Sequence, residues 1–302
     1  MSINSSFENK FGPRVRFKEP LAPLLAYGVG GPADVLVFPK DEEELSWVSN
    51  YSKELQVPIT IIGTGTNLLV LDGGIRGIVI SLSQAFQNID RVESTQVRCG
   101  GGVSKGSLLE WALDRGLAGL EFSAGVPGTV GGGIFMNAGT KYGCYGDILK
   151  ELRLFDFEHG PRTLLREETH FGYREQTAVG KSLVTSVLLE LTPGDTSLLR
   201  QEVNRIIKER AEKQPLDYPS CGSTFKNPPQ GLSAGRLIER AGLKGTAVGG
   251  AEISTKHANF ILNKGNARAS DILSLIALTK EKVRESFEVE LECEVIILGE
   301  AG

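Results

Sequence analysis

Two glycine-rich segments carry the residues of this sequence that are best suited to chemistry. The first, residues 63–74, reads GTGTNLLVLDGG, and the second, residues 123–139, reads SAGVPGTVGGGIFMNAG. Glycine allows positive φ angles, which let N–H groups turn toward a bound oxyanion, and it has no side chain to block the approach. Both segments are therefore suited to cradle a pyrophosphate, and one cofactor that carries a pyrophosphate would explain them together.

A purely structural role, without a bound ligand, explains the first segment better than the second. Taken alone, residues 63–74 are equally well described as a pair of tight turns between strands. Residues 123–139 are harder to explain in that way, because Pro127, Ile134 and Phe135 are not residues of a flexible polar linker. The second segment is therefore predicted to be a structured loop that lies against a flat or anionic group.

Two common nucleotide-binding motifs are present only as fragments. Residues 28–33 read GVGGPA and match the dinucleotide fingerprint G-x-G-x-x-A as letters. However, they contain Pro32 and precede a strand-like segment, where the fingerprint needs a helix. Residues 180–182 resemble the end of a P-loop, but Glu175 stands where its first glycine is required. Neither fragment is expected to bind a nucleotide.

The composition is typical of a globular enzyme. The 302 residues suit two or three domains, and 37 acidic against 33 basic residues give a net charge of −4 with no long basic block. No apolar run approaches the roughly 20 residues of a membrane span, and the N-terminal residues lack the apolar part of a signal sequence. The four cysteines and three histidines are scattered, which argues against a zinc site or a disulfide framework. We expect a cytoplasmic protein without a metal site, a nucleic-acid partner or a membrane partner.

The pattern of apolar residues predicts alternating helices and strands, and hence an α+β fold. Helices are expected over residues 42–55, 103–116, 196–215, 234–242 and 270–287. Strands are expected over residues 34–38, 58–63, 77–82, 89–92, 96–100, 151–157, 182–191, 257–263 and 289–298. Thr196 is a predicted N-cap and Pro215 a predicted helix stop. The proline-rich stretch that follows marks a boundary, and the sequence is divided into three predicted parts: residues 1–85, 86–215 and 216–302.

Ordered blocks of the sequence resemble one known family. After the glycine-rich segments come FGYR (residues 171–174), KQPLDYPSCGSTFKNP (residues 213–228), LIERAGLKG, HANFILN and LECEV. In this order they resemble the UDP-N-acetylenolpyruvoylglucosamine reductases, which belong to the wider vanillyl-alcohol-oxidase type of FAD proteins. The resemblance runs from about Gly30 to the C-terminus. It implies a two-part FAD-binding domain of that type, followed by a smaller C-terminal α+β substrate-binding domain.

The resemblance also implies an activity and its cofactors. NADPH reduces FAD, the reduced flavin passes hydride to the enolpyruvyl group of a UDP-sugar, and the product is UDP-N-acetylmuramate, a peptidoglycan precursor. Because neither glycine-rich segment contains histidine, the FAD is expected to be non-covalent. A monomer is expected. The FAD-binding residues implied by the resemblance are Gly63, Thr64, Gly65, Thr66, Asn67, Leu68, Gly125, Val126, Pro127, Gly128, Thr129 and Gly131.

Hydride addition to an enolpyruvyl double bond leaves negative charge spread onto the carboxylate. The site therefore needs a fixed cation and a proton donor. By resemblance, Arg174 stabilises the developing enolate, Ser223 protonates the intermediate, and Glu294 is the C-terminal catalytic glutamate. The substrate contacts implied by the same resemblance are Tyr173, Lys226 and Asn227.

From the residues alone, each of these assignments has a structural alternative. Arg174 also fits a surface arginine at a strand end, and Ser223 also fits a turn serine beside prolines. Residues 289–298 are expected to form a strand with apolar residues on one face and acids, ending in Glu294, on the other. Because Glu294 is the last acid before that face turns apolar, we expect it to be partly buried, which would raise its pKa.

Some positions have a structural alternative to their family role, and others differ from the family pattern. Lys226 and Asn227 also fit a polar turn. Gln176 replaces a serine of many members, and Ile296 replaces an arginine of some members, so a substrate contact made by that arginine is absent or replaced. The chain lacks an obvious insertion for the tyrosine loop of the longer subtype. Another FAD oxidoreductase of the same fold, or a flavin-binding protein without catalysis, remains an alternative.

Overall fold

Two groups of segments make up the chain in the computed structural model, which describes residues 3–302, with side chains from residue 4 onward. Unit 1 contains the segment that ends at Arg16, Val37–Gly63 and Ile78–Arg210, and unit 2 contains Phe17–Leu36, Thr64–Gly77 and Ala211–Gly302. Residues 1 and 2, with which the first predicted part begins, lie outside the described residues. The three-part division stays a prediction.

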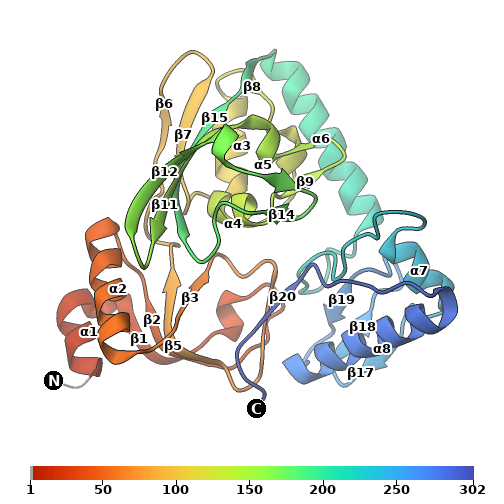
Figure 1. Ribbon diagram of the computed structural model, residues 1–302. Coiled ribbons are helices and arrows are strands. Elements are labelled where there is room, and N and C mark those ends of the chain that lie inside the picture. The colour runs from red at the N-terminus through yellow and green to blue at the C-terminus, as the bar shows by residue number, and fades with distance from the viewer. Residues whose placement is uncertain (1–2) are drawn as a thin grey trace. The chain divides into compact units, whose positions relative to one another are not determined.

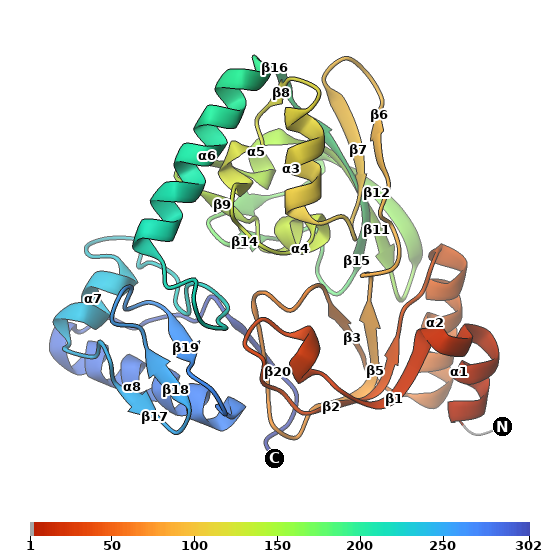
Figure 2. The ribbon, with the colours of Figure 1, turned by 180° about the vertical axis from the view of Figure 1, so that it is seen from behind.

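The largest sheet of unit 1 has five strands in the order β12-β11-β15-β7-β6, all paired antiparallel. Figures 1 and 2 show this sheet with helices α3 and α4 against one face. Apolar side chains of that face, such as Val97, Leu152 and Val187, are buried with Leu108 and Ala112 of α3. From Thr185 onward burial alternates along β15, because successive side chains of a strand point to opposite faces.

The described part of unit 1 includes helices and strands of very different lengths. Of its elements, β1, β5 and α6 each continue across the boundary into unit 2. Its elements are α1 (Ile3–Phe11), η1 (Gly12–Arg14), β1 (Val15–Pro20), α2 (Glu42–Leu55), β3 (Ile59–Ile62), β5 (Ile75–Ser81), β6 (Ile89–Arg91), β7 (Gln96–Gly100), α3 (Lys105–Leu113), β8 (Leu117–Ala118), η3 (Glu121–Ser123), α4 (Val130–Phe135), β9 (Gly139–Thr140), β10 (Gly143–Cys144), α5 (Tyr145–Ile148), β11 (Leu149–Asp156), β12 (Gly160–Leu165), η4 (Arg166–Glu168), β13 (Phe171–Gly172), β14 (Glu175–Gln176), β15 (Leu183–Glu190), β16 (Thr192–Pro193) and α6 (Thr196–Lys213).

Unit 2 is built around one long helix, α8, which covers a three-stranded antiparallel sheet in the order β17-β18-β19. The buried face of α8 includes Ile272, Leu275 and Val283. The C-terminal strand β20 pairs in parallel with β4. The elements of this unit are η2 (Ala22–Leu24), β2 (Pro32–Val37, which crosses into unit 1), β4 (Leu68–Val70), α7 (Ala234–Arg240), β17 (Ala247–Val248), β18 (Ala251–Ile253), β19 (Ile261–Asn263), α8 (Ala269–Phe287) and β20 (Ile296–Leu298).

Several local predictions need correction, among them the strand expected over residues 257–263, which covers only Ile261–Asn263. The last strand covers only Ile296–Leu298, because the backbone before it bonds to single residues of another loop and not to a neighbouring strand. The N-cap of α6 is Asp195, whose carboxylate accepts a hydrogen bond from the N–H of Leu198 at 2.9 Å; the Thr196 hydroxyl instead donates to Leu113. The second glycine-rich segment also contains a short helix, α4, that the sequence analysis did not predict.

Candidate active site

Part of the second glycine-rich segment forms a loop, residues 125–131, that we call the cofactor loop. It lies in unit 1, where the carbonyl of Gly128 accepts a hydrogen bond from the N–H of Lys105 at 2.9 Å. The N–H of Gly131 donates to Gly101 at 2.9 Å, and Thr129 caps α4 by accepting from Gly132 at 3.1 Å. The segment is therefore a fixed loop and not a flexible linker, as the sequence predicted.

The first residue of the first glycine-rich segment, Gly63, meets the cofactor loop inside unit 1. A Cβ atom on Gly63 would lie 3.2 Å from the Thr129 hydroxyl oxygen, and a Cβ atom on Gly125 would lie 3.3 Å from Nε of Arg210. Both glycines thus keep the space beside the loop free of their own side chains. A group with an anionic diphosphate fits a loop of this kind.

The remaining predicted FAD residues of the first segment belong to unit 2. There the turn at Gly65 has φ +64°, and an added Cβ would approach the carbonyl oxygen of Leu24 to 2.7 Å. The amide of Asn67 donates to the carbonyl of Glu294 at 2.9 Å, and Leu68 begins β4. The side chain of Asn67 is therefore used to hold the C-terminal segment next to this turn.

Gly128→Ala tests whether the cofactor loop holds FAD. Gly128 has φ +118°, a conformation that alanine adopts only with strain of about 1–3 kcal/mol. We expect a folded variant that loses FAD readily on gel filtration, measured by the flavin-to-protein absorbance ratio. Gly160→Ala is the matched control, because Gly160 also has positive φ but is the first residue of β12, where it pairs with Asp156 of β11. Equal FAD retention in both variants would contradict the role of the loop.

Arg174 lies in a tight hairpin of unit 1. Strands β13 and β14 pair antiparallel, and Tyr173 and Arg174 form the two-residue turn between them. Arg174 has φ +54°, a left-handed conformation that is uncommon for residues other than glycine, and Nη1 donates to the carbonyl of Gly139 at 3.1 Å. Tyr173 is 55% exposed. The turn therefore exposes the side chain of Tyr173, whereas Arg174 is half-buried.

Asn137 anchors this hairpin and was missed by the sequence analysis. Its buried amide donates to the carbonyl of Gly172 at 2.8 Å, and its oxygen accepts from the N–H of Gly146 at 3.0 Å. Asn137 itself has φ +39°. It stands in the second glycine-rich segment as part of MNAG, so the only signal for it was an asparagine among glycines, a residue type that tolerates the left-handed conformation.

In unit 2, the segment from residue 223 to residue 227 is fixed on two sides, and we call it the serine segment. The carboxamide of Asn259 bonds to both the N–H and the carbonyl of Phe225, at 3.0 and 2.8 Å. On the other side, the N–H of Glu294 donates to the carbonyl of Thr224 at 2.8 Å. The fold therefore brings Ser223 and Glu294 onto adjacent stretches of backbone, although 70 residues separate them in the sequence.

The expected alternation around Glu294 is present without a continuous strand. Leu291 and Val295 are buried, Glu290 and Glu292 are exposed, and Glu294 is half-buried. The apolar side chains pack into the core around α8, whereas the acids before Glu294 stay in solvent. The position of Glu294 as the first partly buried acid was thus correct, but its cause is packing on a loop and not sheet pairing.

Lys226 and Asn227 take part in the structure of the serine segment. The ammonium of Lys226 lies 2.5 Å from the carboxylate of Glu292, and the side-chain oxygen of Asn227 accepts from the N–H of Ala234 at the start of α7. These contacts agree with a structural role as a polar turn. They do not test the predicted contacts with substrate.

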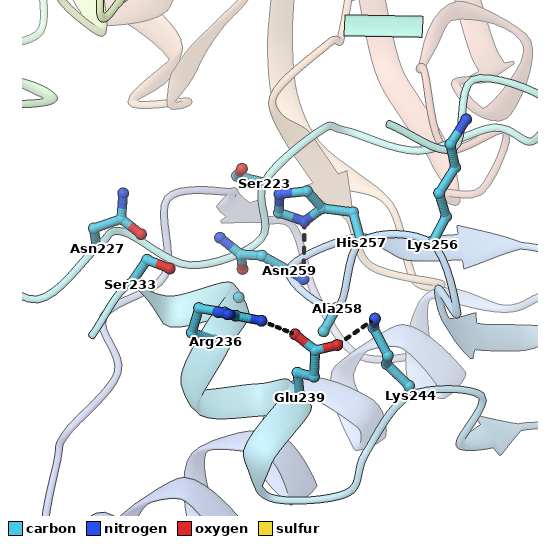
Figure 3. A pocket seen from close by; sticks show the side chains of 11 residues that line it. Ser223, Asn227, Ser233, Arg236, Glu239, Lys244, Lys256, His257, Ala258 and Asn259 are labelled. Atoms are coloured by element: carbon cyan, nitrogen blue, oxygen red, sulfur yellow. Dashed lines mark hydrogen bonds and ion pairs between the residues drawn. The ribbon is translucent and has the colours of Figure 1, made fainter. Parts of the chain in front are cut away.

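A pocket of unit 2 lies beside two of the predicted residues (Figure 3). Its cavity is about 260 Å³. The residues that line it are Ser223, Asn227, Ser233, Gly235, Arg236, Glu239, Lys244, Lys256, His257, Ala258 and Asn259. Lys226 and Glu294 are not among them. Ser223 therefore lies at the wall of a polar cavity.

The charges of the pocket are mostly basic and partly paired. Glu239 accepts from Arg236 at 3.1 Å and from Lys244 at 2.7 Å (Figure 3). Nδ1 of His257 accepts from the N–H of Asn259, and burial lowers the pKa of His257. A pocket with Arg236, Lys244 and a neutral histidine suits an anionic ligand with polar groups. Lys244 and His257 stand in the LIERAGLKG and HANFILN blocks, and Arg236 directly precedes the first of them; none of the three was predicted to have a role.

Some kinds of site are not found in the described part of the chain. Residues 3–302 contain no group of three His, Cys, Asp or Glu side chains placed to hold a metal ion. Within the same residues, no helix has both the length and the apolar character that crossing a membrane requires.

Comparisons with known proteins place this site in a family. A family model described as the C-terminal domain of UDP-N-acetylenolpyruvoylglucosamine reductase matches residues 214–298, and an FAD binding domain matches residues 33–161. A reductase of that name from Moorella thermoacetica is 41% identical over 95% of this chain and 94% of its own length. The chain belongs to this reductase family. A relative from Clostridium tetani is 39% identical over 99% of this chain and 96% of its own length.

Solved structures agree with the family assignment. The reductase from Thermus caldophilus has a TM-score of 0.80 and 36% identity over 94% of this chain and 98% of its own. The BBE-like 1 protein of Physcomitrella patens has a TM-score of 0.50 at 19% identity, over 64% of this chain and 45% of its own, and shows likeness of fold alone. The predicted α+β fold, with a vanillyl-alcohol-oxidase-type FAD-binding part and a separate C-terminal domain, is confirmed. So are the FAD cofactor and the oxidoreductase class.

Proposed function

We propose that the protein reduces UDP-N-acetylglucosamine enolpyruvate to UDP-N-acetylmuramate with NADPH as the hydride source. The pocket at Ser223 is the observation that carries the proposal, because it combines the predicted proton donor with the cationic groups that a UDP-sugar requires. Family membership supports the same substrate. The reaction belongs to the synthesis of peptidoglycan precursors. FAD, when bound, supplies the hydride chemistry.

The residues of the chain have separate roles in this proposal. The guanidinium of Arg174 is fixed by its bond to Gly139 and supplies a permanent positive charge for the enolate, which arginine can contact with two donors. The hydroxyl of Ser223 gives its proton to the carbon next to the carboxylate. Glu294, which is half-buried and whose backbone is held by Thr224 and Asn67, is proposed to return a proton to that hydroxyl or to fix its orientation.

The pocket residues are proposed to bind the UDP-sugar. Arg236 and Lys244 share one carboxylate, that of Glu239, so their combined charge stays positive and suits a diphosphate. Asn227 lines the same cavity, and Tyr173 and Lys226 are proposed as further contacts. Residues 63–68 and the cofactor loop are proposed to hold the FAD without a covalent bond. The protein is proposed to act as a cytoplasmic monomer, with no nucleic-acid or membrane partner.

One experiment tests the substrate directly. The purified, yellow protein is bleached anaerobically with NADPH and is then mixed with UDP-N-acetylglucosamine enolpyruvate. We expect rapid return of the flavin absorbance and a product two hydrogens heavier by mass spectrometry. In D₂O, one deuterium should appear at the carbon next to the carboxylate, since the proton donor there is a hydroxyl that exchanges with solvent.

Two other functions would give different results. Another oxidoreductase of the same fold would bleach with a hydroxy acid or sugar alcohol and would not be reoxidised by the enolpyruvyl sugar. A flavin-binding protein without catalysis would stay yellow with NADPH. Either result would overturn the proposal.

A further inference from the structure

Lys105 is a buried cation that the proposed reaction does not use. It is the first residue of α3 in unit 1, and its side chain is only 5% exposed. Within residues 4–302, its ammonium forms neither a hydrogen bond nor an ion pair with a carboxylate. Buried lysines are rare unless they are paired, because the loss of water around an unpaired charge is costly. An anion that is not part of the protein chain is therefore needed to balance the charge of Lys105.

The charges that act on Lys105 are also positive. Burial and, to a smaller extent, repulsion from Arg174 and Arg210 together lower the pKa of Lys105 to about 8. Burial likewise lowers the pKa of Arg210, for which the described residues provide no ion pair. In addition, Lys105 stands at the N-terminus of a nine-residue helix, where the helix dipole favours an anion over a cation.

Both residues adjoin the cofactor loop, residues 125–131, Lys105 through its backbone and Arg210 through its side chain. The backbone N–H of Lys105 donates to the carbonyl of Gly128 at 2.9 Å. Nε of Arg210 lies 3.3 Å from the position of a Cβ on Gly125, at the start of the loop. Lys105 and Arg210 thus approach the loop from different elements, α3 and α6. Their common neighbour is the loop that is proposed to hold the pyrophosphate.

We propose that Lys105 and Arg210 are the counter-charges of the FAD diphosphate, and that in alkaline solution Lys105 takes up one proton from solvent as FAD binds. The inference rests on the proposed placement of FAD at the cofactor loop and goes beyond it. We prefer the diphosphate to the substrate carboxylate as the partner of Lys105 and Arg210. Its two phosphate charges match the two cations, whereas the single carboxylate of the substrate needs only Arg174. The uptake adds one proton to Nζ of Lys105 and changes no covalent bond between heavy atoms.

The proton uptake makes the affinity for FAD depend on pH. Below the pKa of about 8, Lys105 is already protonated in the free protein, and the affinity should not change with pH. As the pH rises through 8, binding has to bring in a proton, so the affinity should fall by up to about tenfold per pH unit. The fall ends at the higher pKa that Lys105 has beside the diphosphate.

The experiment measures binding of FAD to the apoprotein by flavin fluorescence between pH 6.5 and 10, without substrate. In Lys105→Met we expect FAD affinity at pH 7 to fall about 10- to 100-fold, the range for loss of one hydrogen bond between charged groups. The pH dependence should also disappear. Lys105→Arg should keep the affinity at high pH. Riboflavin, which has no phosphate, should bind equally to the parent and to Lys105→Met.

Lys150→Met is the matched control, because Lys150 is an exposed lysine of unit 1 that is paired with Glu190. It should bind FAD with the parent affinity at every pH. Equal losses for FAD and riboflavin in Lys105→Met would show a purely structural role and overturn the proposal. So would unchanged FAD affinity with a raised KM for the enolpyruvyl sugar, which would assign Lys105 to the substrate carboxylate. FAD binding is measured without substrate. A result that overturns the role of Lys105 can therefore be distinguished from one that overturns the proposed reductase activity.

Discussion

Ser223→Ala is expected to leave flavin reduction by NADPH at the parent rate and to slow reoxidation by the enolpyruvyl sugar about 10²- to 10⁴-fold, the usual cost of losing a general acid. The half-reactions separate because the hydroxyl is needed only when the carbon next to the carboxylate takes its proton. Ser223 lies at the wall of the pocket, and the serine segment is held by backbone bonds to Asn259 and Glu294. Removal of one oxygen should therefore not change the fold.

Stopped-flow absorbance under anaerobic conditions measures both half-reactions of Ser223→Ala. Ser220→Ala is the matched control, since Ser220 stands three residues earlier in the same loop and does not line the pocket. It should leave both rates within about threefold of the parent. Reoxidation of Ser223→Ala at the parent rate would remove Ser223 from the role of proton donor, and equal slowing of both half-reactions would point to damage at the flavin.

Elements fixed by local sequence were predicted well. Helix α2 occupies Glu42–Leu55 as predicted, because apolar residues recur along one face and Asp41 accepts a capping bond from Glu44. Strands β6 and β7 form the predicted hairpin, because a few turn residues separate two short strand-like segments. Such signals act over a few residues, so one sequence is enough to show them.

Features that depend on distant parts of the chain could not be predicted in this way. Gly63 and Thr129 meet, and Glu294 reaches the carbonyl of Thr224, only after the chain has folded. Strand β20 pairs with β4 more than 220 residues away, and no local pattern shows where that pairing ends. The resemblance to a family selected Ser223 and Glu294 as site residues, but their adjacency is a result of tertiary structure.

The buried charge at Lys105 shows a different limit of sequence analysis. A lysine at the start of an amphipathic helix is typically exposed, and nothing in GGGVSKGSLLEWAL marks this one as buried. The burial arises from packing of the cofactor loop over the first turn of α3. Sequence patterns indicate which face of a helix is apolar, but they do not show which loop covers its end.

Arg174→Gly is expected to separate stability from activity. The left-handed turn at Arg174, φ +54°, strains any residue with a side chain by about 1 kcal/mol, and glycine adopts it freely. Loss of the bond to the Gly139 carbonyl costs a similar amount, so we expect the free energy of unfolding to stay within about 1 kcal/mol of the parent. Turnover should nevertheless fall about 10²- to 10³-fold, the usual cost of removing one group that stabilises an oxyanion.

The measurements are urea unfolding and kcat/KM for the enolpyruvyl sugar. Glu288→Gly is the matched control for the backbone, because Glu288 is exposed and has φ +57° at the C-terminal end of α8. It should gain about 0.5–1 kcal/mol in stability with unchanged kcat/KM. Arg174→Lys should recover part of the rate, since it keeps the charge but loses the paired donors of a guanidinium. If Arg174→Gly lost several kcal/mol in stability, the strained turn would be serving the fold, and the loss of turnover would no longer identify Arg174 as the cation of the enolate.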